Sequence, residues 1–145
     1  MTTTPAARLS APSLVQTTSS PSARVYWLNL DQARRALQAA VERLAVEHSE
    51  IEEVWLFGSL ARGDAVPGSD ADLLIVLSST QYSFLDRASR YQPEPCGLGI
   101  DVFAYTRAEI AQMQSSGNRF VHQALGEGIR ILQRNKQSLQ SEVHP

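Results

Sequence analysis

The sequence of 145 residues contains a single cysteine, Cys96, and no long apolar run. One cysteine excludes an intramolecular disulfide bond and argues against a metal site built from cysteine thiolates, and this usage suits the reducing cytoplasm. No apolar segment approaches the roughly 20 residues that a membrane-spanning helix requires. The composition therefore argues against a disulfide-rich secreted protein and against a membrane protein.

The sequence also lacks a large excess of either charge, since its formal net charge is −2. Such a chain has no overall electrostatic field that would draw it to nucleic acid or to an anionic membrane. We therefore expect no direct nucleic-acid binding, and any nucleotide must be held by local contacts. Hydrophobic residues make up 43% of the chain, which is enough for the core of one globular domain.

The two ends of the chain differ from its centre. Residues 1–24 are rich in Thr, Ser, Ala and Pro, contain no acidic residue and show no sustained periodicity. This composition predicts a disordered N-terminal tail, although a transit peptide shares the same acid-poor character. The polar residues 134–145 predict a flexible C-terminal tail. Residues 25–133 then form a single domain.

The hydrophobic pattern of this domain predicts an α/β fold. Apolar residues at spacings of three and four predict a helix that begins at Asn29 or Asp31. Residues 73–77 form an uninterrupted apolar run, which is typical of a strand buried on both faces with helices above and below it. Strand patterns also occur at residues 51–57, 100–105 and 129–132. Helix patterns occur at residues 84–88, 106–113 and 120–125. We expect a small mixed β-sheet with helices packed on it.

Two aspartates stand where the strand of residues 73–77 begins. Side chains alternate between the two faces of a strand, so Asp70 and Asp72 point the same way. Two adjacent carboxylates repel each other unless a cation lies between them. Mg²⁺ takes oxygen ligands and is commonly bound by one or two carboxylates together with substrate phosphates. The pair therefore suits a complex of a metal ion with a nucleotide.

The preceding strand ends at Gly58 and Ser59, which can supply the other half of such a site. Glycine allows a close approach of the backbone to a phosphate, and serine offers a hydroxyl and a backbone N–H to an anion. Arg62 follows one helical turn later and can neutralise a phosphate oxygen. These three residues are the candidate nucleotide-binding residues.

Gly58-Ser59, ten intervening residues and then Asp70-Ala71-Asp72 resemble the signature of the DNA polymerase beta-like nucleotidyltransferase superfamily. The short chain and the sequence of residues 57–64 resemble those of its minimal nucleotidyltransferase branch. These are the MNT proteins, which are often paired with a HEPN partner. The resemblance covers residues 30–133. It implies a nucleotidyltransferase fold, ATP as substrate and two bound Mg²⁺ ions.

The resemblance also implies a third acidic residue on a following strand, and Asp101 is the candidate. An acid early in an apolar strand is costly to bury without a partner. If the strand of Asp101 lies beside that of Asp72, the three carboxylates form one cluster with Asp70. These three residues are the predicted catalytic and metal-binding residues, in a site where two cations stabilise the attacking and leaving oxygens of a phosphoryl transfer.

Two other polar residues, Asp64 and His122, are interpreted without a catalytic role. Asp64 is expected to be a solvated loop acid rather than a metal ligand. His122 is expected to be structural or exposed, with a place in the nucleotide pocket as the alternative.

The predicted function is transfer of AMP from ATP to an acceptor hydroxyl. The resemblance suggests that the acceptor lies on a partner HEPN toxin, so that the chain would be an antitoxin. Because only about 110 residues remain for the domain, a partner or a homodimer is expected to complete the binding site. The alternatives are a binding module that neutralises its partner by occlusion, and a transferase acting on a small molecule such as an antibiotic.

Overall fold

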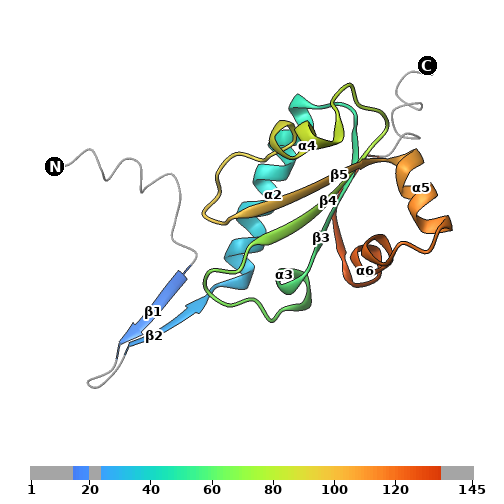
Figure 1. Ribbon diagram of the computed structural model, residues 1–145. Helices are drawn as coiled ribbons and strands as arrows, with labels where there is room; N and C mark the ends of the chain where they lie inside the picture. Colours follow the sequence, from blue (N-terminus) through green and yellow to red (C-terminus); the bar gives the residue numbers. More distant parts are fainter. Residues whose placement is uncertain (1–14, 20–23, 135–145) are drawn as a thin grey trace, which may run out of the picture.

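The computed structural model describes residues 15–19 and 24–134, with side chains from residue 29 onward. At its N-terminal end, β1 (Val15–Ser19) and β2 (Arg24–Leu28) form an antiparallel two-stranded sheet. Figure 1 shows this pair extending away from the larger sheet. The segment predicted to be a disordered N-terminal tail thus includes β1 and Arg24, the first residue of β2. Of the predicted C-terminal tail, Arg134 is described, and its backbone N–H donates a hydrogen bond of 2.8 Å to the carbonyl oxygen of Glu52. The other residues of the two predicted tails lie outside the described residues.

A mixed sheet of four strands forms the centre of the domain. The strands are β3 (Ile51–Phe57), β4 (Ala71–Leu77), β5 (Ile100–Thr106) and β6 (Ile129–Gln133), in the spatial order β5-β4-β3-β6. β3 is antiparallel to both β4 and β6, whereas β4 and β5 are parallel. The predicted mixed sheet is confirmed.

Helices cover both faces of this sheet (Figure 1). They are α2 (Leu30–Glu47), α3 (Ser59–Arg62), α4 (Phe84–Arg90), α5 (Arg107–Ser115) and α6 (Arg119–Glu127). The buried face of α2 packs on one side of the sheet, and α5 and α6 pack on the other. Within β4, Leu73 and Ile75 face α2 while Leu74 faces α5 and α6. This alternation confirms that the apolar run of β4 is buried on both faces.

The helices begin where their capping residues predict. Asn29 accepts a hydrogen bond from the backbone N–H of Gln32 at 3.0 Å, and Asn118 caps α6 in the same way. Thr106 and Glu109 exchange the two hydrogen bonds of a capping box at the start of α5. Among the described residues, no helix is both long enough and apolar enough to cross a membrane.

The alternation of side chains along the strands decides which face carries the acidic residues. Asp72 lies two residues before Leu74 on β4, and Asp101 lies two residues before Phe103 on β5. Both apolar residues belong to the core beneath α5 and α6. The two carboxylates therefore belong to the same face of the sheet.

Candidate active site

Asp72 and Asp101 are direct neighbours in the parallel pair of β4 and β5, where they are partners in register. This confirms the expectation that the strand of Asp101 lies beside that of Asp72. Asp72 is half-buried, whereas Asp101 and Asp70 are exposed. Burial raises the pKa of Asp72 above its ordinary value, and the negative charges of Asp101 and Asp70 raise this pKa further. The three predicted carboxylates thus interact electrostatically at one end of β4.

The carboxylates of Asp70, Asp72 and Asp101 form no hydrogen bond or ion pair with any other described residue. Three such groups, whose mutual repulsion is not relieved by a direct partner, are the hard oxygen ligands that Mg²⁺ prefers. Within residues 29–134, however, no group of three or more His, Cys, Asp or Glu side chains is arranged to hold a metal ion. The chemistry of the donors fits a divalent cation, and further ligands would have to come from a substrate.

Two glycines make room for the aspartates. Gly58 has a φ of +79°, and a Cβ atom at this position would overlap the carboxylate of Asp72. A Cβ atom on Gly99 would overlap the carboxylate of Asp70, and the Gly99 carbonyl accepts a hydrogen bond of 2.8 Å from the backbone N–H of Ala71. Gly58 was predicted to be part of the site, but Gly99 was not, because its contact with Asp70 arises only in the folded chain.

A cavity of about 280 Å³ opens beside Asp72. It is lined by Phe57, Gly58, Ser59, Arg62, Asp72, Phe120, Gln123, Ala124 and Glu127. The structure therefore brings Gly58, Ser59 and Arg62 together with Asp72 around one cavity, whereas Asp70 and Asp101 lie outside its lining. A volume near the lower end of that of small-molecule sites suits part of a nucleotide.

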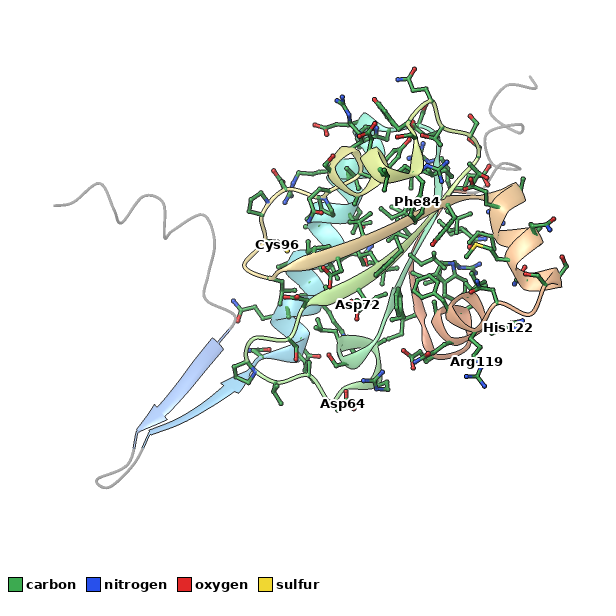
Figure 2. All side chains as sticks on the ribbon, viewed as in Figure 1. Asp64, Asp72, Phe84, Cys96, Arg119 and His122 are labelled. Atoms are coloured by element: carbon green, nitrogen blue, oxygen red, sulfur yellow. The ribbon has the colours of Figure 1, made fainter. Side chains whose placement is uncertain are left out.

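Helix α6 forms one wall of this cavity through Phe120, Gln123, Ala124 and Glu127. Their spacing places them on one face of the helix. Sequence reasoning missed this face and considered His122 instead. His122 is exposed and points away from Asp72 on the outer side of α6 (Figure 2). The helical spacing that begins at Phe120 could have identified the wall.

Carboxylates surround the candidate phosphate-binding residues. The backbone N–H of Gly58 donates a hydrogen bond of 2.9 Å to Oε2 of Glu127. The guanidinium of Arg62 pairs with Glu127 at 3.3 Å and with Asp64 at 3.3 Å. The hydrogen bond that Arg62 donates to the carboxylate of Asp64 is the largest cause of the raised pKa of Arg62. Asp64 is exposed, as expected, and lies on the loop after α3 (Figure 2).

Helix α3, which carries Ser59 and Arg62, is held in place by α2. The guanidinium of Arg34 on α2 donates hydrogen bonds to the carbonyl oxygen of Leu60, one of them at 3.2 Å, and to that of Ala61 at 3.3 Å. The side chain of Leu60 is fully buried in the core beneath α2. This short turn is therefore fixed from two sides.

Comparison with protein families identifies one match. Residues 40–137 match the model of the family described as "Polymerase beta, Nucleotidyltransferase". The matched segment includes all the predicted site residues, and it covers more than half of the chain. No curated protein matches the sequence.

The solved structures that are similar to this chain include the following two. One is a protein of Sulfolobus solfataricus proposed to be a nucleotidyltransferase, with a TM-score of 0.50 and 23% identity over 72% of this chain and 86% of that one. The other is a toxin–antitoxin structure with AMP-PNP, with a TM-score of 0.45 and 15% identity over 73% of this chain and 81% of that one. The likeness to the Sulfolobus solfataricus protein concerns the fold alone.

Proposed function

We propose a function for this chain from the family to which it belongs. The chain is a member of the polymerase beta nucleotidyltransferases. The activity proposed is transfer of AMP from ATP to an acceptor hydroxyl. The observation that carries this proposal is the position of Asp72, which lies beside Asp101 on the neighbouring strand and also lines the cavity with Gly58 and Ser59. This position supports the proposal, because it places the proposed catalytic carboxylates next to the proposed phosphate-binding residues.

The reaction is a substitution at the α-phosphorus of ATP. The oxygen of the acceptor hydroxyl forms a bond to this phosphorus, the bond to the bridging oxygen breaks, and pyrophosphate leaves. The proton of the hydroxyl passes to a carboxylate oxygen of Asp101, which is exposed next to Asp72. Gly58, Ser59 and Arg62 would hold the β- and γ-phosphates.

A divalent cation fits the charge of this site. Asp70, Asp72 and Asp101, with Asp64 and Glu127 near Arg62, form a strongly negative surrounding that would repel a free triphosphate. Mg²⁺ ions, two in this proposal, would be held by the three predicted aspartates together with oxygen atoms of the substrate, and would neutralise the charge of the triphosphate.

The proposed acceptor is a hydroxyl on a partner HEPN toxin in the cytoplasm, and the chain is then an antitoxin that acts by adenylylation. The sequence motif of residues 57–72 supports this part of the proposal through its resemblance to MNT proteins. The partner, or a second copy of the chain, would complete a cavity that is small for a whole nucleotide.

A second candidate function is neutralisation of the partner by occlusion, with little turnover. One observation favours it: the backbone N–H of Gly58 already donates to Glu127, so the site is not open to a phosphate in this conformation. Occlusion would survive loss of the aspartates, whereas neutralisation by adenylylation would not.

The test uses ATP labelled with radioactive phosphorus at the α position, with Mg²⁺, in a lysate supplemented with purified protein. We expect a labelled protein band with the wild type. Removing a metal-binding carboxylate should cost several kcal/mol of transition-state stabilisation, so Asp70→Asn and Asp72→Asn should each lower labelling by roughly 100-fold or more.

The matched control is Asp86→Asn, because Asp86 is an exposed acid on α4 that does not line the cavity. Equal labelling by the wild type and by the Asp70 and Asp72 variants would contradict the proposal. Absence of labelling in every sample, with a partner still co-purifying, would favour occlusion.

A further inference from the structure

The carboxylate of Glu127 occupies a position that suits an anionic ligand. Its Oε2 atom accepts a hydrogen bond of 2.9 Å from the backbone N–H of Gly58 and pairs at 3.3 Å with Nη1 of Arg62. These two groups are the donors on which the proposed function places the phosphates of ATP. Glu127 therefore uses the same backbone N–H and the same guanidinium as the substrate would.

This position is not explained by the stability of α6. Glu127 is the last residue of that helix, where the partial negative charge of the helix end disfavours an acidic side chain. The next residue, Gly128, has little space, because a Cβ atom there would overlap the carbonyl oxygen of Ala124. The tight turn from α6 into β6 thus holds Glu127 over the cavity, and Gly58 and Arg62 compensate its charge.

Glu127 lines the same cavity as Gly58, Arg62 and Asp72. A triphosphate that entered the cavity would meet the negative charge of Glu127 on the groups that should receive it. The side chain of Glu127 is 21% exposed, so it has a path to solvent.

We propose that Glu127 is an internal competitor of the triphosphate, which occupies the Gly58 N–H and Arg62 in the free protein and must leave before a nucleotide binds. This inference rests on the proposed function, because it takes a nucleotide phosphate as the ligand of the cavity. Glu127 then sets the affinity for ATP and keeps the site closed until a nucleotide, with its cation, displaces the carboxylate.

The experiment measures equilibrium binding of three probes, Mg²⁺–ATP, Mg²⁺–tripolyphosphate and adenosine, by calorimetry. The variants are Glu127→Gln, which removes the charge and keeps a similar shape, and Glu127→Ala, which removes the whole group. The control is Glu47→Gln, an exposed residue at the end of α2, because it changes the net charge by the same amount. Thermal unfolding verifies that each variant is folded.

We expect both Glu127 variants to bind Mg²⁺–ATP and Mg²⁺–tripolyphosphate about tenfold more tightly than the wild type, since a hydrogen-bonded charge no longer competes. Binding of adenosine should not change, and Glu47→Gln should behave as the wild type. Equal or weaker phosphate binding by both Glu127 variants, or no binding at all, would overturn the inference. Weaker binding would mean that Glu127 instead holds Arg62 in position.

The failure of this inference is distinguishable from that of the proposed function. Label transfer from ATP that depends on Asp70 and Asp72, together with unchanged affinity in the Glu127 variants, would overturn only the competitor role. Tighter phosphate binding by the Glu127 variants, without label transfer by any form of the protein, would overturn only the proposed activity.

Discussion

Asp72 of β4 and Asp101 of β5 are register partners on parallel strands, so two carboxylates separated by 28 residues of sequence lie side by side on one face of the sheet. Burial and the neighbouring charges of Asp101 and Asp70 raise the pKa of Asp72. The cluster therefore lowers the stability of the fold in the absence of a cation, which is a common property of sites arranged for binding.

Replacing Asp101 with asparagine should raise the stability of the fold and abolish label transfer from ATP. The variant removes a negative charge from beside Asp72, so in the presence of EDTA its melting temperature should rise by about 1–4 °C. Addition of Mg²⁺ should raise the melting temperature of the wild type more than that of the variant, and label transfer from ATP should be lost. Thermal unfolding with and without Mg²⁺ provides the measurement.

Asp86→Asn is again the matched control, and its response to Mg²⁺ should equal that of the wild type. A lower melting temperature of Asp101→Asn in EDTA would show that Asp101 stabilises the fold, contrary to the repulsion argued here.

Gly99→Ala should impair activity with little effect on stability. The added Cβ atom would overlap the carboxylate of Asp70, which is the movable end of an exposed side chain. Asp70 would then have to shift, and small displacements of reacting groups can cost about 10- to 100-fold in rate. The free energy of unfolding should change by less than about 1 kcal/mol. Labelling rates and denaturant unfolding measure the two effects.

Gly126→Ala is the control for this substitution. Gly126 lies in α6, and a Cβ atom there would have no heavy atom within 4 Å. Both substitutions add the same methyl group, but only the one at Gly99 meets the carboxylate of Asp70. Normal labelling is therefore expected of the Gly126 variant and not of the Gly99 variant. If Gly99→Ala labels at the wild-type rate, Asp70 does not depend on the space that Gly99 provides.

The fold was largely predictable because its signals are local. The periodic apolar residues of α2, the unbroken run of β4 and the capping box at Thr106 each need only a short segment to be recognised. The place of Asp101 beside Asp72 was expected from the family resemblance, which implies a third acidic residue on a following strand. Local patterns therefore identified both strands, and the resemblance identified the acid on β5.

The parts that were missed depend on contacts between distant segments. Glu127 reaches Gly58 across 69 positions of sequence, and no periodicity in α6 indicates that its last residue accepts a hydrogen bond from the end of β3. Gly99 is similar, since its role is to leave space for Asp70. The same holds for Arg34 of α2, which donates to backbone carbonyl groups of α3. Such contacts follow from packing, which the sequence does not display.

The final prediction concerns the ion pair that joins α4 to α5. Nη1 and Nη2 of Arg87 bind the two carboxylate oxygens of Glu109 at 2.7 and 3.2 Å, and Nη1 also donates to the carbonyl oxygen of Ala104 on β5. Arg87 is buried, whereas the side chain of Glu109 is 42% exposed. Loss of the Glu109 charge would leave a buried guanidinium without its counter-ion. Glu109→Gln should therefore lower the free energy of unfolding at neutral pH by about 1–3 kcal/mol.

The same pair predicts the response to acid. The hydrogen bond from Arg87 lowers the pKa of Glu109 below its ordinary value of 4.5, although burial opposes this shift. The unfolded chain then takes up the proton at a higher pH than the folded protein does. The stabilisation is therefore complete above about pH 4.5 and is lost as the pH falls through the pKa of the folded state. Denaturant unfolding between pH 3 and pH 7 (roughly the range that includes this titration) should show a smaller acid-induced loss in Glu109→Gln than in the wild type. Glu47→Gln removes an exposed charge without breaking an ion pair, so its free energy of unfolding should change with pH as that of the wild type does. The same pH dependence in Glu109→Gln would mean that other carboxylates govern acid unfolding.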